Sequence, residues 1–160
     1  MLEKQKITPH LWFDDNAEEA ANFYVSVFEN ARILDIGRYT DVGPGTPGSV
    51  VTVAFELEGQ KFVGINGGPH FKFNEAVSFF VSCDTQEEID RFWDALTPGG
   101  EIQQCGWLKD KFGLAWQINY SGLSDLIQDS NREKASRAMQ AMLQMKKIDI
   151  GELRAAYDGQ

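Results

Sequence analysis

Two side chains in this sequence have the chemistry of catalytic groups, the thiol of Cys105 and the imidazole of His10. A thiol becomes a nucleophile when a nearby cation or a helix N-terminus lowers its pKa, and Lys109 and Lys111 follow Cys105 closely. An imidazole can transfer protons or bind a metal ion. The alternative is that Cys105 packs as a small residue beside Trp107 and that His10 is a hydrogen-bonded polar residue. We therefore treat Cys105 and His10 as candidate catalytic residues, with both interpretations open.

The other reactive side chains are few, and their surroundings favour structural roles. Cys83 and Cys105 are not in Cys-x-x-Cys spacing, so the sequence predicts neither a disulfide framework nor a structural zinc site. His70 follows a segment rich in Gly and Pro, which is typical of a solvated loop. Asp110 precedes the turn at Gly113, and we expect it to cap that hairpin rather than act as a base.

Composition excludes several classes of function. With 160 residues, of which 42% are hydrophobic and 24% charged, the chain is typical of an ordinary globular protein of one domain. A formal net charge of −9 argues against nucleic acid and anionic membranes as partners, because both attract clusters of Lys and Arg. We find no apolar run of membrane-spanning length and no apolar signal core at the start. We therefore expect a cytoplasmic protein.

A ten-residue pattern occurs twice in the sequence, at residues 15–24 and again at residues 84–93. In both copies a polar cap is followed three residues later by Glu and then by an aromatic pair, and an apolar stretch comes just before. Chance is the alternative explanation, since strand–turn–helix segments are common. The matching order of ten positions favours a duplicated strand–helix unit, and such a duplication has a natural seam for a ligand.

The elements around each copy follow one plan. In the first half we predict strands at residues 7–13, 32–39, 50–57 and 61–65. Asn16 and Glu19 have the spacing of a capping box at the start of the helix. Residues 41–49 are too rich in Gly and Pro for a regular element and predict a long mobile loop.

The second half repeats this order, with strands predicted at residues 76–83, 101–108 and 114–119. Thr85 and Glu88 form the second capping box. The tail has helical spacing of apolar residues at Ala135, Ala138, Met139, Met142 and Leu143, followed by Ile148, Ile150, Leu153 and Tyr157. We expect this stripe to pack against the body or a second subunit, although methionines can also form an adaptable binding surface.

These elements predict an α+β fold made of duplicated βαβββ modules, whose sheets form a larger curved mixed sheet with the helices outside. The modules would span residues 7–66 and 76–120, and a helical tail would span residues 121–160 of a single domain.

This plan resembles the vicinal oxygen chelate superfamily, the fold of glyoxalases, extradiol dioxygenases and bleomycin-resistance proteins. Four segments resemble its PhnB-like branch, whose members often carry the name 3-demethylubiquinone-9 3-methyltransferase: His10-Leu-Trp-Phe-Asp14, Ile65-Asn-Gly-Gly-Pro69, Cys105-Gly-Trp-Leu-Lys-Asp110 and Phe112-Gly-Leu-Ala-Trp-Gln117. The resemblance covers nearly the whole chain, including the tail. It also implies a homodimer, because related proteins commonly pair their modules across two chains.

The resemblance implies where a metal would bind. In catalytic members His and Glu ligands from matching strands hold a divalent ion in the cup of the sheet. The corresponding positions here are His10, Ser78, Gln117 and a corner near Gly64 to Asn66. One imidazole, a hydroxyl and an amide do not hold zinc, nickel or iron(II) tightly, so we predict a site with no metal and no cofactor.

The methyltransferase name is not supported by the residues. A cofactor such as S-adenosylmethionine is usually held by a Gly-rich turn after the first strand, and here Asp14-Asp15-Asn16 follows that strand. The segment from Gly64 to Gly68 is followed by Pro69 and no helix. Methyl transfer is therefore the disfavoured alternative.

We expect the cup to bind a small organic molecule. If Ser78 and Gln117 face it, strand alternation places Phe80, Ser82, Ala115 and Asn119 on the same face, and His10 shares a face with Trp12. The predicted ligand contacts are His10, Trp12, Asn66, Ser78, Phe80, Trp107 and Gln117.

Two alternatives to a binding cup stay open. The polar residues of the cup could satisfy only one another or water. A metal-dependent enzyme of the glyoxalase or dioxygenase type would need His10 together with Glu56, Glu58 or Glu101. The loop at residues 41–49 could close over the cup or be a passive connection.

Overall fold

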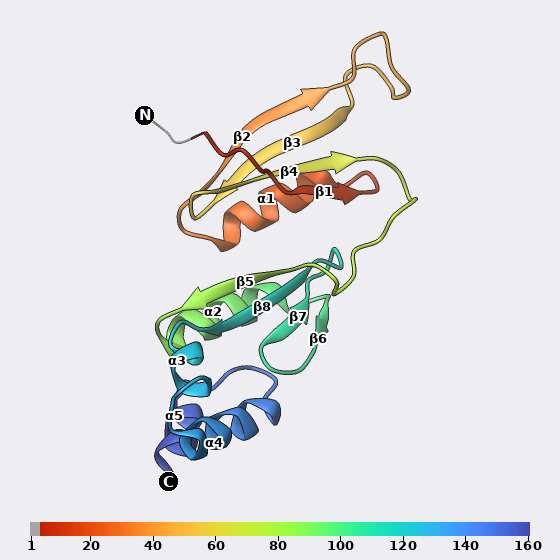
Figure 1. Ribbon diagram of the computed structural model, residues 1–160. Coiled ribbons are helices and arrows are strands. Elements are labelled where there is room, and N and C mark those ends of the chain that lie inside the picture. The colour runs from red at the N-terminus through yellow and green to blue at the C-terminus, as the bar shows by residue number, and fades with distance from the viewer. Residues whose placement is uncertain (1–3) are drawn as a thin grey trace. The chain divides into compact units, whose positions relative to one another are not determined.

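The computed structural model describes residues 4–160 and divides into two compact units, one ending at Phe73 and the other running from Asn74 to Gln160. Each unit contains a four-stranded sheet with a helix against one of its faces (Figure 1). The predicted α+β fold of two βαβββ modules is therefore confirmed, and helices follow at the C-terminus. No helix of residues 4–160 is long and apolar enough to cross a membrane.

The first unit has the order strand, helix, strand, strand, strand. Its elements are β1 (His10–Phe13), α1 (Ala17–Val27), β2 (Ala31–Arg38), β3 (Val50–Leu57) and β4 (Gln60–Asn66). The strands lie in the order β1-β4-β3-β2. β1 and β4 are parallel, and the other two pairs are antiparallel.

The second unit repeats this topology. Its elements are β5 (Ser78–Cys83), α2 (Gln86–Leu96), β6 (Glu101–Ile102), β7 (Trp107–Lys109) and β8 (Ala115–Tyr120). The order β5-β8-β7-β6 reproduces that of the first sheet, again with the first and last strands of the module parallel. The repeat seen in the sequence is thus a repeat of the whole module.

Each core lies between a sheet and its own helix. In the first unit the buried face of α1 meets Phe55, whose ring stacks on those of Tyr24 and Phe62 at centroid distances of 6.0 and 5.4 Å. In the second unit α2 buries Ile89, Phe92, Trp93 and Leu96. Because one sheet face in each unit is taken by the helix, functional side chains must lie on the other face or at the sheet ends.

The two helices begin differently. At α2 the hydroxyl of Thr85 accepts a hydrogen bond from the amide of Glu88 (3.2 Å), and the carboxylate of Glu88 accepts one from the amide of Asp84 (2.8 Å). At α1 the side chain of Asn16 makes no capping hydrogen bond, so the capping box predicted there is wrong. The reason is that Asn66, at the end of β4, supplies the acceptor instead.

Two predicted strands also differ clearly from the structure, whereas the ends of the others agree to within one or two residues. The first strand begins at His10 rather than at residue 7. The strand predicted over residues 101–108 is divided into β6 and β7, because Cys105 and Gly106 have φ angles of 58° and 83° and turn the chain. The loop at residues 41–49 has no regular element, as predicted, and its mobility stays a prediction.

The C-terminal tail forms three helices and packs within the second unit (Figure 1). These are α3 (Leu123–Ile127), α4 (Arg132–Leu143) and α5 (Ile150–Asp158). Ile148 and Leu153 are fully buried, whereas Leu143 of the predicted stripe is 54% exposed. Arg137 joins α4 to the end of α5 by donating hydrogen bonds to the carbonyls of Ala156 (2.9 Å) and Tyr157 (2.8 Å).

Candidate ligand-binding site

Four of the predicted ligand contacts lie on the open face of the second sheet. Strand pairing places Phe80 of β5 beside Gln117 of β8, and Gln117 beside Trp107 of β7. Ser78 lies two residues before Phe80 and therefore shares its face. The amide nitrogen of Gln117 donates a hydrogen bond to the hydroxyl of Ser78 (2.8 Å). The opposite face carries Trp116 and packs toward α2, so these four residues form one group directed away from the core.

The group combines aromatic surface with one amide. Phe80 is 52% exposed, and Ser78, Trp107 and Gln117 are half-buried. A glutamine amide has two N–H donors and an acceptor oxygen, and within residues 4–160 the Gln117 amide is bonded only to Ser78. One N–H and the carbonyl oxygen can therefore bond to a ligand whose apolar part lies against the two rings.

Asn119 and Ala115 share this face in the register but are buried. Asn119 donates a hydrogen bond to the carbonyl of Cys105 (3.4 Å), and its own oxygen accepts from the amide of Tyr120 (2.9 Å). The open part of the face therefore lies around Gln117 and excludes Asn119.

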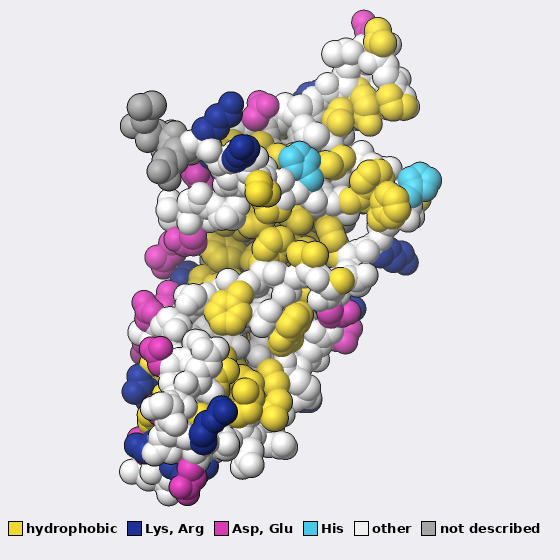
Figure 2. Space-filling model, viewed as in Figure 1, with side chains coloured by type: hydrophobic (Ala, Val, Ile, Leu, Met, Phe, Trp, Pro, Cys, Tyr) yellow, Lys and Arg dark blue, Asp and Glu magenta, His cyan; other side chains and the backbone are white. Residues whose placement is uncertain are grey.

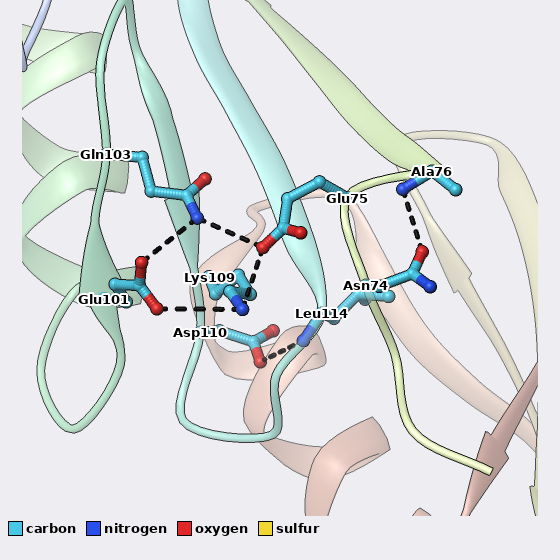
Figure 3. A network of polar contacts seen from close by, with 8 residues as sticks. All are labelled: Asn74, Glu75, Ala76, Glu101, Gln103, Lys109, Asp110 and Leu114. Carbon is cyan, nitrogen blue, oxygen red and sulfur yellow. Dashed lines mark hydrogen bonds and ion pairs between the residues drawn. The ribbon is translucent and has the colours of Figure 1, made fainter.

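A charged network that the sequence analysis missed borders this face (Figure 3). The ammonium of Lys109 lies 2.8 Å from a carboxylate oxygen of Glu75 and 3.6 Å from one of Glu101. Gln103 donates to the same two carboxylates at 3.2 and 3.3 Å. Lys109 is two residues after Trp107 on β7, so strand alternation was the signal that could have placed it on this face.

The hydrogen bond from Lys109 dominates the electrostatics of the network. It lowers the pKa of Glu75 from 4.5 to about 2, with smaller effects from a backbone hydrogen bond and from Gln103. The same bond raises the pKa of Lys109. Two carboxylates and one ammonium leave a single negative charge at the border of the face, in a group whose members already have partners.

Asp110 has the hairpin-capping role predicted for it. The residue is 2% exposed. One carboxylate oxygen accepts hydrogen bonds from the amides of Phe112 (2.8 Å) and Leu114 (3.1 Å), and the other accepts from the indole nitrogen of Trp116 (2.9 Å). These bonds hold the turn between β7 and β8, and they direct the carboxylate away from the open face.

In the first unit, His10 and Trp12 lie on the face opposite α1. Both histidines of the chain are at the surface (Figure 2), and the ring of His10 is hydrogen-bonded at Nδ1 to the carbonyl of Thr8 (3.0 Å). The indole of Trp12 donates to the carbonyl of Gly68 (2.9 Å) and meets the ring of Phe71 edge to face at 4.9 Å. Trp12 thus holds the segment after β4 against β1.

Asn66 lies on the other side of that sheet. Its strand partner is Phe13, which is buried toward α1. Its side-chain oxygen accepts from the amide of Ala17 (2.9 Å), and its nitrogen donates to the carbonyl of Val50 (3.2 Å). Both the oxygen and the nitrogen of the amide are hydrogen-bonded to the backbone, so Asn66 is not among the proposed ligand contacts.

The two cysteines have different settings. Cys83 is buried, and this burial raises the pKa of its thiol to about 12, which makes it a poor nucleophile. Cys105 is half-buried in the turn before Trp107. The two lysines that follow it in sequence have other partners, since Lys109 pairs with Glu75 and Lys111 lies over the ring of Phe112.

The donor atoms do not fit a tightly held divalent metal. Within residues 4–160, no group of three or more His, Cys, Asp or Glu side chains is arranged to hold one. Ser78 and Gln117 lie at the positions that correspond to metal ligands in catalytic members of the superfamily. Their side chains are a neutral hydroxyl and a neutral amide, and the two are hydrogen-bonded to each other.

The residues fit S-adenosylmethionine no better. β1 leads into α1 through Asp14-Asp15-Asn16, without a glycine turn, and the first amide of α1 is already bonded to Asn66.

Residues 5–119 match the family described as 3-demethylubiquinone-9 3-methyltransferase. The chain belongs to this family. Its resemblance to the PhnB-like branch is confirmed by a solved structure described as a putative 3-demethylubiquinone-9 3-methyltransferase, PhnB protein, from Bacillus cereus. The two are 41% identical with a TM-score of 0.67, over 72% of this chain and 99% of that one. No curated protein matches the chain.

More distant structures share the fold. Protein PA1353 from Pseudomonas aeruginosa is 20% identical with a TM-score of 0.63, over 73% of this chain and 98% of that one. The fosfomycin resistance protein FosX from Listeria monocytogenes, a structure with Mn(II) and sulfate, is 12% identical with a TM-score of 0.51, over 80% and 98%. At these identities the likeness shows the vicinal oxygen chelate fold alone.

The tail lies outside the PhnB-like family match. The match ends at residue 119, and 99% of the Bacillus cereus chain is covered by only 72% of this one. The expectation that the resemblance includes the tail is therefore wrong. Helical spacing alone could not distinguish an added segment from one shared with the family.

Proposed function

We propose that this PhnB-like protein binds a small organic molecule on the open face of its second sheet, without a tightly held metal. The observation that carries the proposal is the position of Gln117, which lies between Phe80 and Trp107 in the strand register and donates a hydrogen bond to Ser78. Aromatic walls with a few placed polar groups are typical of small-molecule sites. The apolar body of the ligand lies on the rings, and its polar group bonds to the Gln117 amide.

Further parts of the proposal concern the rest of the chain. The ligand contacts predicted at His10 and Trp12, on the open face of the first sheet, stay predictions outside this site, and Cys105 and His10 stay candidate catalytic residues. The homodimer and the cytoplasmic location also stay predictions.

The family description supports one second candidate, methyl transfer from S-adenosylmethionine. Isothermal titration of the protein with S-adenosylmethionine tests it directly. We expect no binding, because the first strand leads into α1 without a glycine turn. Saturable binding would favour the methyltransferase.

The first experiment is native mass spectrometry of freshly purified protein, compared with the mass of the denatured chain. We expect chains that carry an organic mass and no metal mass, and the same spectrum reports the oligomeric state. One metal mass per chain would contradict the metal-free site and would make His10 the first residue to replace. If no mass is retained, a thermal-shift screen of a fragment library supplies the probe.

The second experiment uses that molecule to test the site. We expect Gln117→Leu to weaken binding at least tenfold, because a lost hydrogen bond of about 1.4 kcal/mol corresponds to that factor. Ser78→Leu should weaken binding as well, since it removes the acceptor that orients the amide. Gln60→Leu, at an exposed position of the first unit, is the matched control. Unchanged affinity in a folded Gln117→Leu variant would remove this face as the binding site.

A further inference from the structure

The turn before Trp107 has an unusual backbone for its sequence. Cys105 has a φ of 58° and Gly106 has a φ of 83°. The amide of Trp107 closes the turn with a hydrogen bond to the carbonyl of Gln104 (3.0 Å). Two successive positive φ angles are easy for Asn-Gly or Gly-Gly, whereas a cysteine in the first position is strained, because its Cβ lies close to the following carbonyl oxygen. Something outside the turn must therefore stabilise this conformation.

On the sheet side, β8 holds the two turn carbonyls: the amide of Ile118 donates to the carbonyl of Gly106 (2.7 Å), and Asn119 donates to that of Cys105 (3.4 Å). The C-terminal tail holds the two turn amides. The amide of Cys105 donates to the carbonyl of Met145 (2.8 Å), and the amide of Gly106 donates to the carbonyl of Lys146 (2.7 Å). The side chain of Ile148 is fully buried and lies against Gly106, where a Cβ would come within 3.0 Å of it. The segment at residues 145–148 thus covers the turn with two hydrogen bonds and one buried side chain.

The same segment is fixed at its other end to α2. The side chain of Gln86 donates to the carbonyl of Ile148 (3.0 Å) and accepts from the amide of Ile150 (2.9 Å). The ammonium of Lys147 lies 2.8 Å from a carboxylate oxygen of Asp90. These contacts with α2 fix the position of residues 145–148. The segment can therefore hold the turn in one place.

We infer that the tail is a positioning element for the open face, with Ile148 holding the Cys105–Gly106 turn and, through it, Trp107. The family match ends at residue 119, so this support comes from a segment outside the matched part of the chain. Ile148 is buried against Gly106. Trp107 directly follows Gly106 in the sequence and pairs with Gln117 in the sheet. The placement of Trp107 by the tail does not depend on whether a ligand binds there.

Fluorine NMR of full-length protein labelled with 5-fluorotryptophan tests this placement. The chain contains four tryptophans, and Trp107→Phe assigns the Trp107 resonance by its disappearance. We expect Ile148→Ala to shift or broaden the Trp107 resonance, because the turn loses its buried contact, and Ile148→Val to restore it. Leu153→Ala is the matched control, since Leu153 is an equally buried aliphatic residue of the tail, in α5.

The control separates positioning from a general loss of stability. Ile148→Ala and Leu153→Ala both create a cavity in the tail, so only a positioning role predicts a larger effect of Ile148→Ala on Trp107. A Trp107 resonance that is unchanged in Ile148→Ala, or that shifts equally in Leu153→Ala, overturns the inference. If Ile148→Ala does not fold, Gln86→Leu loosens the same segment without a cavity, and the same comparison is made with it.

Discussion

The carboxylate of Asp110 should contribute more to the stability of the second unit than any exposed acidic residue. Asp110 is 2% exposed, and its carboxylate accepts hydrogen bonds from the amides of Phe112 and Leu114 and from the indole of Trp116. Asp110→Asn keeps one oxygen for the two amides but places an N–H group against the indole N–H. A hydrogen bond to a charged group contributes about 1.5–3 kcal/mol, so we expect unfolding free energy to fall by about 2–3 kcal/mol.

A double-mutant cycle isolates the indole bond. Trp116→Phe removes the indole donor, and in that background Asp110→Asn no longer brings two donors together. The cost of Asp110→Asn should therefore be smaller by about 1–2 kcal/mol in the Trp116→Phe protein. Urea unfolding followed by far-UV circular dichroism measures all four proteins.

The control for this cycle is Asp41→Asn, in an exposed loop, which should change stability by less than about 0.5 kcal/mol. A coupling energy below about 0.5 kcal/mol between positions 110 and 116 would refute the reasoning. It would mean that the carboxylate acts through the turn amides alone.

Two further predictions concern the ends of strands. Asn66→Ala should lower unfolding free energy by about 1–3 kcal/mol in urea denaturation, because it removes the side-chain acceptor of the first amide of α1 and a donor to the carbonyl of Val50; a loss below about 0.5 kcal/mol would contradict this. The pKa of Glu75 is lowered from 4.5 to about 2 in the folded state, so its contribution to stability is present above pH 4.5 and is lost as the pH falls toward 2. Glu75→Gln should therefore melt at a lower temperature than the parent protein at pH 6, with the difference shrinking between pH 4.5 and 2; a constant difference would show that its ionisation is not linked to folding.

The sequence predicted an element well where its pattern involves residues that are neighbours in the chain. The residues of β3 were predicted from 50 to 57, as they lie in the structure, because an alternating apolar run has clear ends. The capping box of α2 was also correct, since Thr85 and Glu88 are neighbours on one turn. Strand alternation likewise placed Ser78, Phe80 and Gln117 on one face.

The errors came from partners distant in sequence. The acceptor at the start of α1 belongs to Asn66, 49 positions after Ala17, and no local rule could favour it over Asn16. The break between β6 and β7 depends on carbonyls of Met145 and Lys146, which stabilise a turn that Cys-Gly alone predicts weakly. The Lys109 network joins three separate segments and needed the strand register to be seen.

The parallel pairing of the first and last strands in each module has a consequence for synthesis. His10 pairs with Val63, 63 − 10 = 53 positions later, so β1 has no sheet partner until β4 has left the ribosome. At roughly 5–20 residues per second this interval lasts about 3–10 s. An unpaired strand can associate with other nascent chains, but β1 has only four residues and follows Pro9, which lacks an N–H to donate. A short first strand therefore limits aggregation during translation.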